Sequence, residues 1–146
     1  MAVYVGIRDN GSAQVSVDGA LLPPRNDLKN HSPNGCEWGY AGSGPSQLAL
    51  AVLAHHFHDA GDEQELADVK ALALYHAFKD ELVAKLPRKG WELDSHVVAD
   101  TVQMIVRGSA EHLFSEAMRL TVENKWLNKN LDEAYTQLED ADNGAI

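Results

Sequence analysis

The feature that most constrains the fold is an apolar run, residues 48–54, which follows directly on a loop rich in glycine. A helix formed by this run has no polar face, and such helices are usually buried on more than one side. Pro45 suits the first turn of the helix, and Gly44 before it is the expected N-cap. Gln47 is then placed to bond back toward the cap, as the glutamine of a capping box does. We therefore expect a helix at the centre of the domain.

The loop that feeds this helix is expected to be ordered but irregular. Gly39, Gly42 and Gly44 permit positive φ, which other residues adopt only at a cost. Trp38 and Tyr40 are expected to anchor the loop on the sheet or on the central helix. We expect its polar residues to form a network that holds the loop together. The predicted structural loop residues are Arg25, Asp27, Asn30, His31, Glu37, Trp38, Tyr40, Gly42 and Gly44.

The N-terminal segment has the alternating pattern of β-strands. Residues 3–7 and 14–17 alternate apolar with other side chains, and Asn10-Gly11 between them is a preferred hairpin turn. Residues 20–22 add a short third strand, and residues 90–93 are predicted to form a later strand at an edge of the same sheet. The pattern predicts a small antiparallel sheet.

Two helices are expected to form an antiparallel hairpin that covers one face of this sheet. The first ends near Asp59 and Gly61, and the second begins after Glu63 and ends at Pro87. The apolar residues of the second helix fall on two neighbouring stripes, which together predict one broad apolar face. The apolar residues of one stripe are Leu66, Val69, Leu72, Ala73 and Val83, and those of the other are Leu74, Tyr75, Phe78, Leu82 and Leu86.

Two further helices are predicted in the last third of the chain. Residues 95–107 are expected to form one, capped by Asp94 or Ser95, although their β-branched content leaves a strand as the rival. Residues 109–141 carry a heptad pattern, which predicts a long helix of about 50 Å. The seam residues are Leu113, Ala117, Leu120, Asn124, Leu127, Leu131, Ala134 and Leu138.

The chain as a whole suits one α+β domain with a helical extension. Its 146 residues, 45% hydrophobic and 23% charged, have the composition of an ordinary folded domain with a sizeable core. We expect residues 1–108 to form a core of antiparallel sheet and helical hairpin. Residues 109–146 are expected to form a long acidic helix that packs on this core or protrudes from it.

Charge and hydropathy restrict the partners. There are 12 basic and 22 acidic residues, so the net charge is −10 with neutral histidines. Direct nucleic-acid binding is therefore not expected, whereas a basic protein surface would attract the chain. No apolar run reaches the ~20 residues that span a bilayer, and the N-terminus lacks a signal-peptide pattern. A cytoplasmic location without membrane contact is expected, and the single cysteine, Cys36, fits a reducing compartment.

Two loop features could carry chemistry, and each has a structural alternative. The glycines around Ser43 present helix N–H groups that could bind an anion, although the spacings of a phosphate loop and of a nucleophile elbow are absent. A simple helix entry explains the same glycines. Cys36 beside Glu37, with His31 as a base, could act as a nucleophile, but nothing close in the sequence lowers the pKa of its thiol.

A histidine cluster stands at the end of the central helix. His55 and Asp59 are four residues apart and face the same way, with His56 and His58 beside them. The cluster could bind a metal with a third ligand from elsewhere, or reflect the preference of helix C-termini for cations. Without a strict ligand motif, neither a metal nor another cofactor is expected.

The residues of the loop and of the start of the central helix together form a recognisable sequence pattern. They are Pro24-Arg25, Asp27-Leu28, Asn30-His31-Ser32-Pro33, Gly35, Glu37-Trp38-Gly39-Tyr40, Gly42-Ser43-Gly44-Pro45 and Gln47-Leu48-Ala49-Leu50-Ala51. The pattern resembles a family of small uncharacterised proteins from bacteriophages and bacterial mobile elements, a domain of unknown function, and the resemblance continues through Tyr75, Phe78 and Trp91. The sequence departs from it at Cys36, where an aromatic residue is expected, and after about Leu93. The resemblance implies a phage or mobile-element context and no particular activity.

Charge, the long C-terminal helix and the context that the resemblance implies together predict a non-enzymatic, protein-binding factor. The sharpest hypothesis is an inhibitor of a host nucleic-acid-handling defence complex, of the anti-CRISPR kind. Its partner would be a host protein complex with a basic surface. The predicted partner-binding residues are Glu116, Glu123, Trp126, Asp132, Glu133, Tyr135 and Glu139.

Two alternatives stay open. A small enzyme or ligand-binding protein would use the loop around His31, Glu37 and Ser43. A structural module would form a homodimer along the heptad seam, where Asn124 at a core position would set the register.

Overall fold

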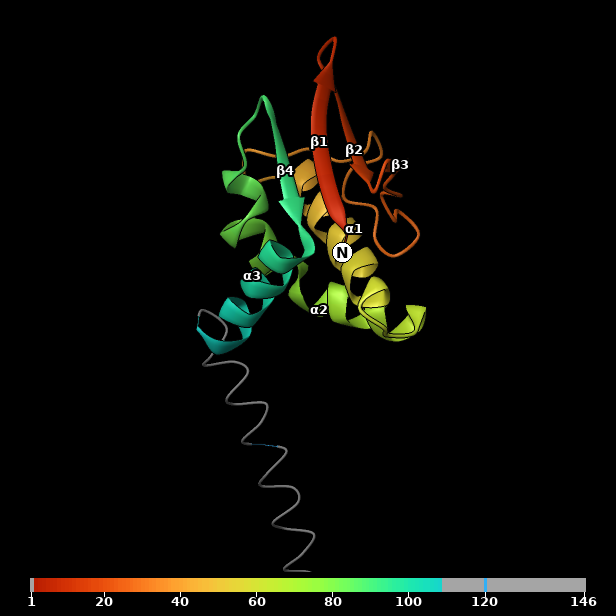
Figure 1. Cartoon of the computed structure of the whole chain (residues 1–146), viewed down its shortest axis with the longest axis vertical. Coiled ribbons are helices and arrows are strands. Elements are labelled where there is room, and N and C mark those ends of the chain that lie inside the picture. Colours follow the sequence, from red (N-terminus) through yellow and green to blue (C-terminus); the bar gives the residue numbers. More distant parts are fainter. Residues whose placement is uncertain (1, 109–119, 121–146) are drawn as a thin grey trace, which may run out of the picture. The chain divides into compact units, whose positions relative to one another are not determined.

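The computed structural model describes residues 2–108 and residue 120. These residues contain four antiparallel strands in one sheet and three α-helices (Figure 1). The strands are β1 (Val3–Asp9), β2 (Ser12–Val17), β3 (Ala20–Leu21) and β4 (Gly90–Asp94). The helices are α1 (Ser43–Asp59), α2 (Gln64–Glu81) and α3 (Ser95–Arg107), with a 3-10 turn η1 (Val83–Lys85) after α2. The α+β class predicted from the sequence is confirmed.

The strand order is β3-β2-β1-β4, so β4 lies at an edge beside β1, as predicted. On β1, Tyr4 pairs with Val17 on one side and with Leu93 on the other. Gly6 stands opposite Trp91 of β4. A methyl group at Gly6 would lie 2.3 Å from the indole ring, so this position of the central strand requires glycine.

The hairpin predicted at Asn10-Gly11 is confirmed. Asn10 has φ 51° and Gly11 has φ 81°, which is the pair of positive angles that a type I′ turn needs. A second tight turn follows β2, where Asp18 has φ 50° and Gly19 has φ 83°. The carboxylate of Asp18 also accepts a hydrogen bond from the Val3 amide at 2.9 Å, which ties this turn to the start of β1.

The predicted central helix is confirmed as α1. Residues 44–54 are all buried. α2 packs along α1 as the second half of the helical hairpin, and Tyr4 of the sheet reaches His55 on α1. Figure 1 shows α1 behind the strands and next to α2. A helix without a polar face is thus covered on more than one side, as its composition requires.

The start of α1 differs from the prediction. The helix begins at Ser43, and its N-cap is Gly42 with extended angles (φ −177°, ψ −169°) rather than Gly44. Of the three loop glycines expected to need positive φ, Gly39 alone has it, at 84°. Gly44 is required for space instead, because a methyl group there would lie 2.6 Å from Cβ of Glu37.

α2 also differs from its prediction, in both its end and its face. It ends at Glu81, where the chain turns into η1 before Pro87 is reached. Its buried residues are Ala67, Ala71, Tyr75 and Phe78. Of the other predicted stripe, Leu66, Val69 and Leu72 are exposed to solvent, whereas Val83 in η1 is buried. The single broad apolar face predicted for this helix is therefore divided into a surface that packs in the core and a surface that is exposed to solvent.

Residues 95–107 form a helix, α3, and not the rival strand. The carboxylate of Asp94 caps it by accepting a hydrogen bond from the Val97 amide at 3.0 Å. Val98 and Ile105 are buried on its inner face. In the described residues, no helix has both the length and the apolar composition needed to cross a membrane. Apart from Leu120, the long helix predicted from residue 109 lies outside these residues.

We expect Gly44→Val to lower the free energy of unfolding by about 2 kcal/mol, the typical cost of overpacking. The neighbouring Cβ of Glu37 cannot move away easily because the Glu37 carboxylate is bound by Arg8. Urea denaturation would measure the change. Ser43→Ala, at an exposed position in the same turn, is the control and should stay within about 0.5 kcal/mol of wild type. Equal stability of the two variants would contradict the close-packing argument.

Candidate functional site

The three loop residues considered above for chemistry each meet a different part of the fold. His31 Nε2 lies 2.7 Å from the hydroxyl of Tyr75 on α2. Glu37 is bound by Arg8 of β1. Ser43 is exposed at the start of α1. Each side chain therefore has its own surroundings, and no hydrogen bond joins one of the three to another within residues 2–108.

Arg8 holds Glu37 through two parallel hydrogen bonds, Nη1 to Oε1 at 2.9 Å and Nη2 to Oε2 at 2.7 Å. Its Nε donates to the carbonyl of Arg88 at 2.6 Å, and its guanidinium lies 4.6 Å from the centre of the Trp38 ring. Hydrogen bonding from Arg8 lowers the pKa of Glu37. Glu37 is thus an ionised partner that fastens the loop to β1 and not an available base.

Arg25 fastens the other end of the loop. Its Nη1 and Nη2 donate to the two carboxylate oxygens of Asp68 on α2, both at 2.9 Å, and its Nε donates to Asp27 at 3.0 Å. Asn30 belongs to a separate pair, in which its side chain accepts from Asn26 at 2.9 Å. Asp68 lies 43 residues beyond Arg25, and nothing in the local sequence indicates this pairing.

Gln47 does not cap its own helix, so that prediction is wrong. Its side chain is fully buried, and Oε1 accepts from the amides of His31 at 2.8 Å and Ser32 at 3.2 Å. Nε2 donates to the carbonyl of Pro24 at 2.5 Å. The helix begins earlier than expected, so Gln47 lies beyond the cap position and faces the loop. Its amide satisfies loop backbone groups that have no strand partner.

Cys36 is not activated as a nucleophile. Burial raises the pKa of its thiol to about 12, and the carboxylate of Glu37 contributes in the same direction. Since the thiolate is the reactive form, this shift disfavours a nucleophilic role for Cys36 at neutral pH. His31, the base considered for it, is hydrogen-bonded to Tyr75 instead.

The histidines at the end of α1 have different partners. His55 Nδ1 lies 2.7 Å from the hydroxyl of Tyr4, and His58 Nδ1 lies 3.0 Å from the carbonyl of Asp62. Burial lowers the pKa of His56. Across the described residues, no group of three His, Cys, Asp or Glu side chains is arranged to hold a metal ion.

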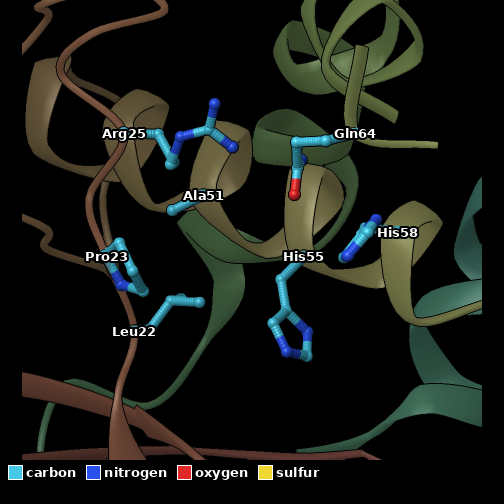
Figure 2. Close-up of a pocket in the computed structure, with 7 residues that line it drawn as sticks. All are labelled: Leu22, Pro23, Arg25, Ala51, His55, His58 and Gln64. Carbon is cyan, nitrogen blue, oxygen red and sulfur yellow. The ribbon is translucent and has the colours of Figure 1, made fainter. Parts of the chain in front are cut away.

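A small pocket opens beside these histidines, between the loop after β3 and the helices α1 and α2 (Figure 2). Its volume is about 280 Å³, just below the range of roughly 300–1,000 Å³ for ligand pockets. Leu22, Pro23 and Ala51 form apolar walls. The polar lining residues are Arg25, His55, His58 and Gln64. The pocket combines apolar surface with a few polar groups, as small-molecule sites do.

The solvent side of α2 carries a row of large apolar side chains. Leu66, Val69 and Leu72 are 49%, 63% and 38% exposed. They recur every three residues and so follow one face of the helix. We name these three residues the α2 stripe. Large apolar side chains exposed near one another on one helix are a candidate surface for binding another protein.

The predicted partner-binding residues lie outside the described part of the chain, as do the heptad seam residues apart from Leu120. Partner binding and dimerisation through these residues therefore stay predictions.

The fold and the loop define a small α+β domain in which a polar loop is fastened to a sheet and to two helices. A family model described as Family of unknown function (DUF6166) matches residues 4–104, more than half of the chain. The chain therefore belongs to this family. The matched residues include the whole polar loop that precedes α1. No curated protein and no solved structure matches the chain.

Gln47→Leu is expected to lower the free energy of unfolding by about 3 kcal/mol, because it leaves loop amides and a carbonyl without partners. Urea denaturation measures this loss. Gln103→Leu, at an exposed position on α3, makes the same chemical change and should cost less than about 0.5 kcal/mol. A Gln47→Leu protein as stable as the Gln103→Leu control would show that the amide does not hold the loop.

His31 should make stability depend on pH. Desolvation, together with Lys29, His76 and Lys79, lowers the pKa of His31 below the usual ~6.5. The unfolded state then binds more protons, so the contribution of His31 is present above pH ~6.5 and is lost as pH falls through the lower folded pKa. The stability difference between wild type and His31→Gln should accordingly shrink below pH ~6.5. Urea melts over a pH series, with His96→Gln as an exposed control, test this, and a difference that grows on acidification would contradict it.

Proposed function

We propose that the protein is a non-enzymatic binding factor that docks on another protein through the α2 stripe. The observation that supports this proposal is the placement of apolar side chains at the start of α2, which is the reverse of the usual one. Small residues, Ala67 and Ala71, face the core, whereas Leu66 and Val69 face solvent. Large apolar side chains at helical spacing are the anchors by which a helix sits in a groove of its partner.

Charge around the stripe indicates the chemistry of that groove. Asp62, Glu63 and Glu65 surround the first turn of α2, against one nearby lysine, Lys70, which pairs with Asp62 at 2.7 Å. An acidic border around an apolar stripe favours a partner with an apolar groove bordered by basic side chains. The net charge of −10 acts in the same direction over longer distances.

The sharper form of the proposal is inhibition of a host nucleic-acid-handling defence complex, of the anti-CRISPR kind. Such complexes have basic grooves that hold nucleic acid, and an acidic protein can occupy them. Residues 109–146 hold eight acidic and three basic residues, a net charge of 3 minus 8, or −5. The acidic members of the predicted set at positions 116–139 are proposed to reach this groove. The phage context implied by the loop pattern supports the same class of partner.

The environments of the loop residues favour a binding protein over an enzyme. Glu37 is held by Arg8, and the thiol of Cys36 has a raised pKa. Neither group is poised to take or give a proton near neutral pH. The loop is accordingly proposed to be a structural clamp.

The double variant Leu66→Gln with Val69→Gln should weaken partner binding about 100-fold, because both apolar anchors are lost while the charge stays the same. Tagged protein would be purified from host extract, the co-purified proteins identified, and the affinity for the recovered complex measured. Val97→Gln, at an exposed valine on α3, is the matched control and should bind as wild type does. Binding should also weaken as salt rises above ~0.1 M.

Two results would contradict the proposal. Equal binding by the double variant and by Val97→Gln would show that the α2 stripe is not the docking surface. A doubled solution mass that the double variant abolishes, with no other protein recovered, would make the stripe a dimer interface. For the sharper form, the recovered complex must bind less nucleic acid when the protein is added.

A further inference from the structure

The pocket beside His55 is lined by none of the three residues of the α2 stripe. Leu22 and Pro23 lie opposite His58, and Arg25 and Gln64 lie opposite His55 (Figure 2). The proline ring and its apolar neighbours offer surface for a flat ligand. The polar groups at the rim decide which ligand fits.

His55 contributes a hydrogen-bond donor. Tyr4 is fully buried, and the partner of its hydroxyl in residues 2–108 is His55 Nδ1, at 2.7 Å. Desolvation, with Asp59 and Asp18, raises the pKa of Tyr4, so the hydroxyl keeps its proton. That proton needs an acceptor, since a buried unpaired O–H is costly. Nδ1 is therefore the acceptor, and in the neutral ring Nε2 carries the N–H.

Gln64 and His58 contribute acceptors. Gln64 uses Nε2 to donate to Asp68 at 2.7 Å, so its carbonyl oxygen remains for a ligand. His58 Nδ1 faces the carbonyl of Asp62 at 3.0 Å, and a carbonyl can only accept. Nδ1 therefore carries a proton, and Nε2 of the neutral ring is an acceptor.

The charges around the pocket do not suit an anion. Arg25 directs four hydrogen bonds to the carboxylates of Asp27 and Asp68, so its charge is compensated by two negative groups. Asp18 and Asp59 act on the nearby Tyr4 hydroxyl as well. These carboxylates would repel a ligand that carries a carboxylate or phosphate. They would not repel a neutral ligand.

We propose that this pocket binds an uncharged, planar nitrogen heterocycle of the nucleobase class. The apolar walls would cover its faces, His55 Nε2–H would donate to a ring nitrogen or carbonyl, and Gln64 would accept from an N–H. The volume of about 280 Å³ suits one heterocycle better than a nucleotide with its sugar and phosphate. This site is independent of the docking function proposed for the α2 stripe.

The test uses adenine and cytosine as probes and benzoate as an anion with a ring of similar size. Both bases should bind saturably with one site per chain in calorimetry, and NMR shifts should map to Ala51, His55 and Gln64. Ring ¹⁵N shifts of His55 should show protonated Nε2 and bare Nδ1. Gln64→Leu should weaken binding about tenfold, whereas Gln103→Leu should not change it.

Three outcomes would overturn the proposal. They are the absence of saturable binding by either base, benzoate binding as tightly as the bases, and Gln64→Leu binding as wild type does. Gln64 is exposed at the start of α2, and the thermal unfolding of this variant checks that it is folded. The double variant Tyr4→Phe with His55→Phe provides a second test, because it removes the donor without leaving the tyrosine hydroxyl unpaired. It too should lose base binding.

Discussion

Burial of the first part of α1 on every side is the constraint on which the rest of the structure depends. Residues 44–54 turn no face to water, so the sheet, α2 and the irregular loop each cover part of the helix. Backbone groups of a covering loop have no strand partners, and each one left unpaired costs roughly 1–3 kcal/mol. Gln47 meets this need, since its buried amide bonds to the loop at three points.

Charged pairs then fasten the loop at both ends. Arg8 on β1 holds Glu37, and Asp68 on α2 holds Arg25, each through two parallel bonds. Such bidentate pairs fix direction as well as distance. The polar residues of the loop therefore have a structural role that explains their presence.

α2 connects the two candidate surfaces. Gln64 in its first turn lines the pocket, and Leu66 in the same turn begins the α2 stripe. Ala67 and Ala71 lie on the packed side of α2, where their small side chains allow the helix to approach α1 closely. The larger Leu66 and Val69 lie on the solvent side. This arrangement leaves large apolar side chains on the solvent side of α2, where we propose that a partner binds.

The sequence alone determined the elements and the fold class, because these depend on local chemistry. Alternation predicted the strands, Asn10-Gly11 the first turn, and the unbroken apolar run the buried helix. Tertiary structure decided which side of α2 is packed, where the amide of Gln47 points and that Asp68 meets Arg25. Those outcomes depend on contacts between segments far apart in the chain, for which periodicity and spacing carry no information.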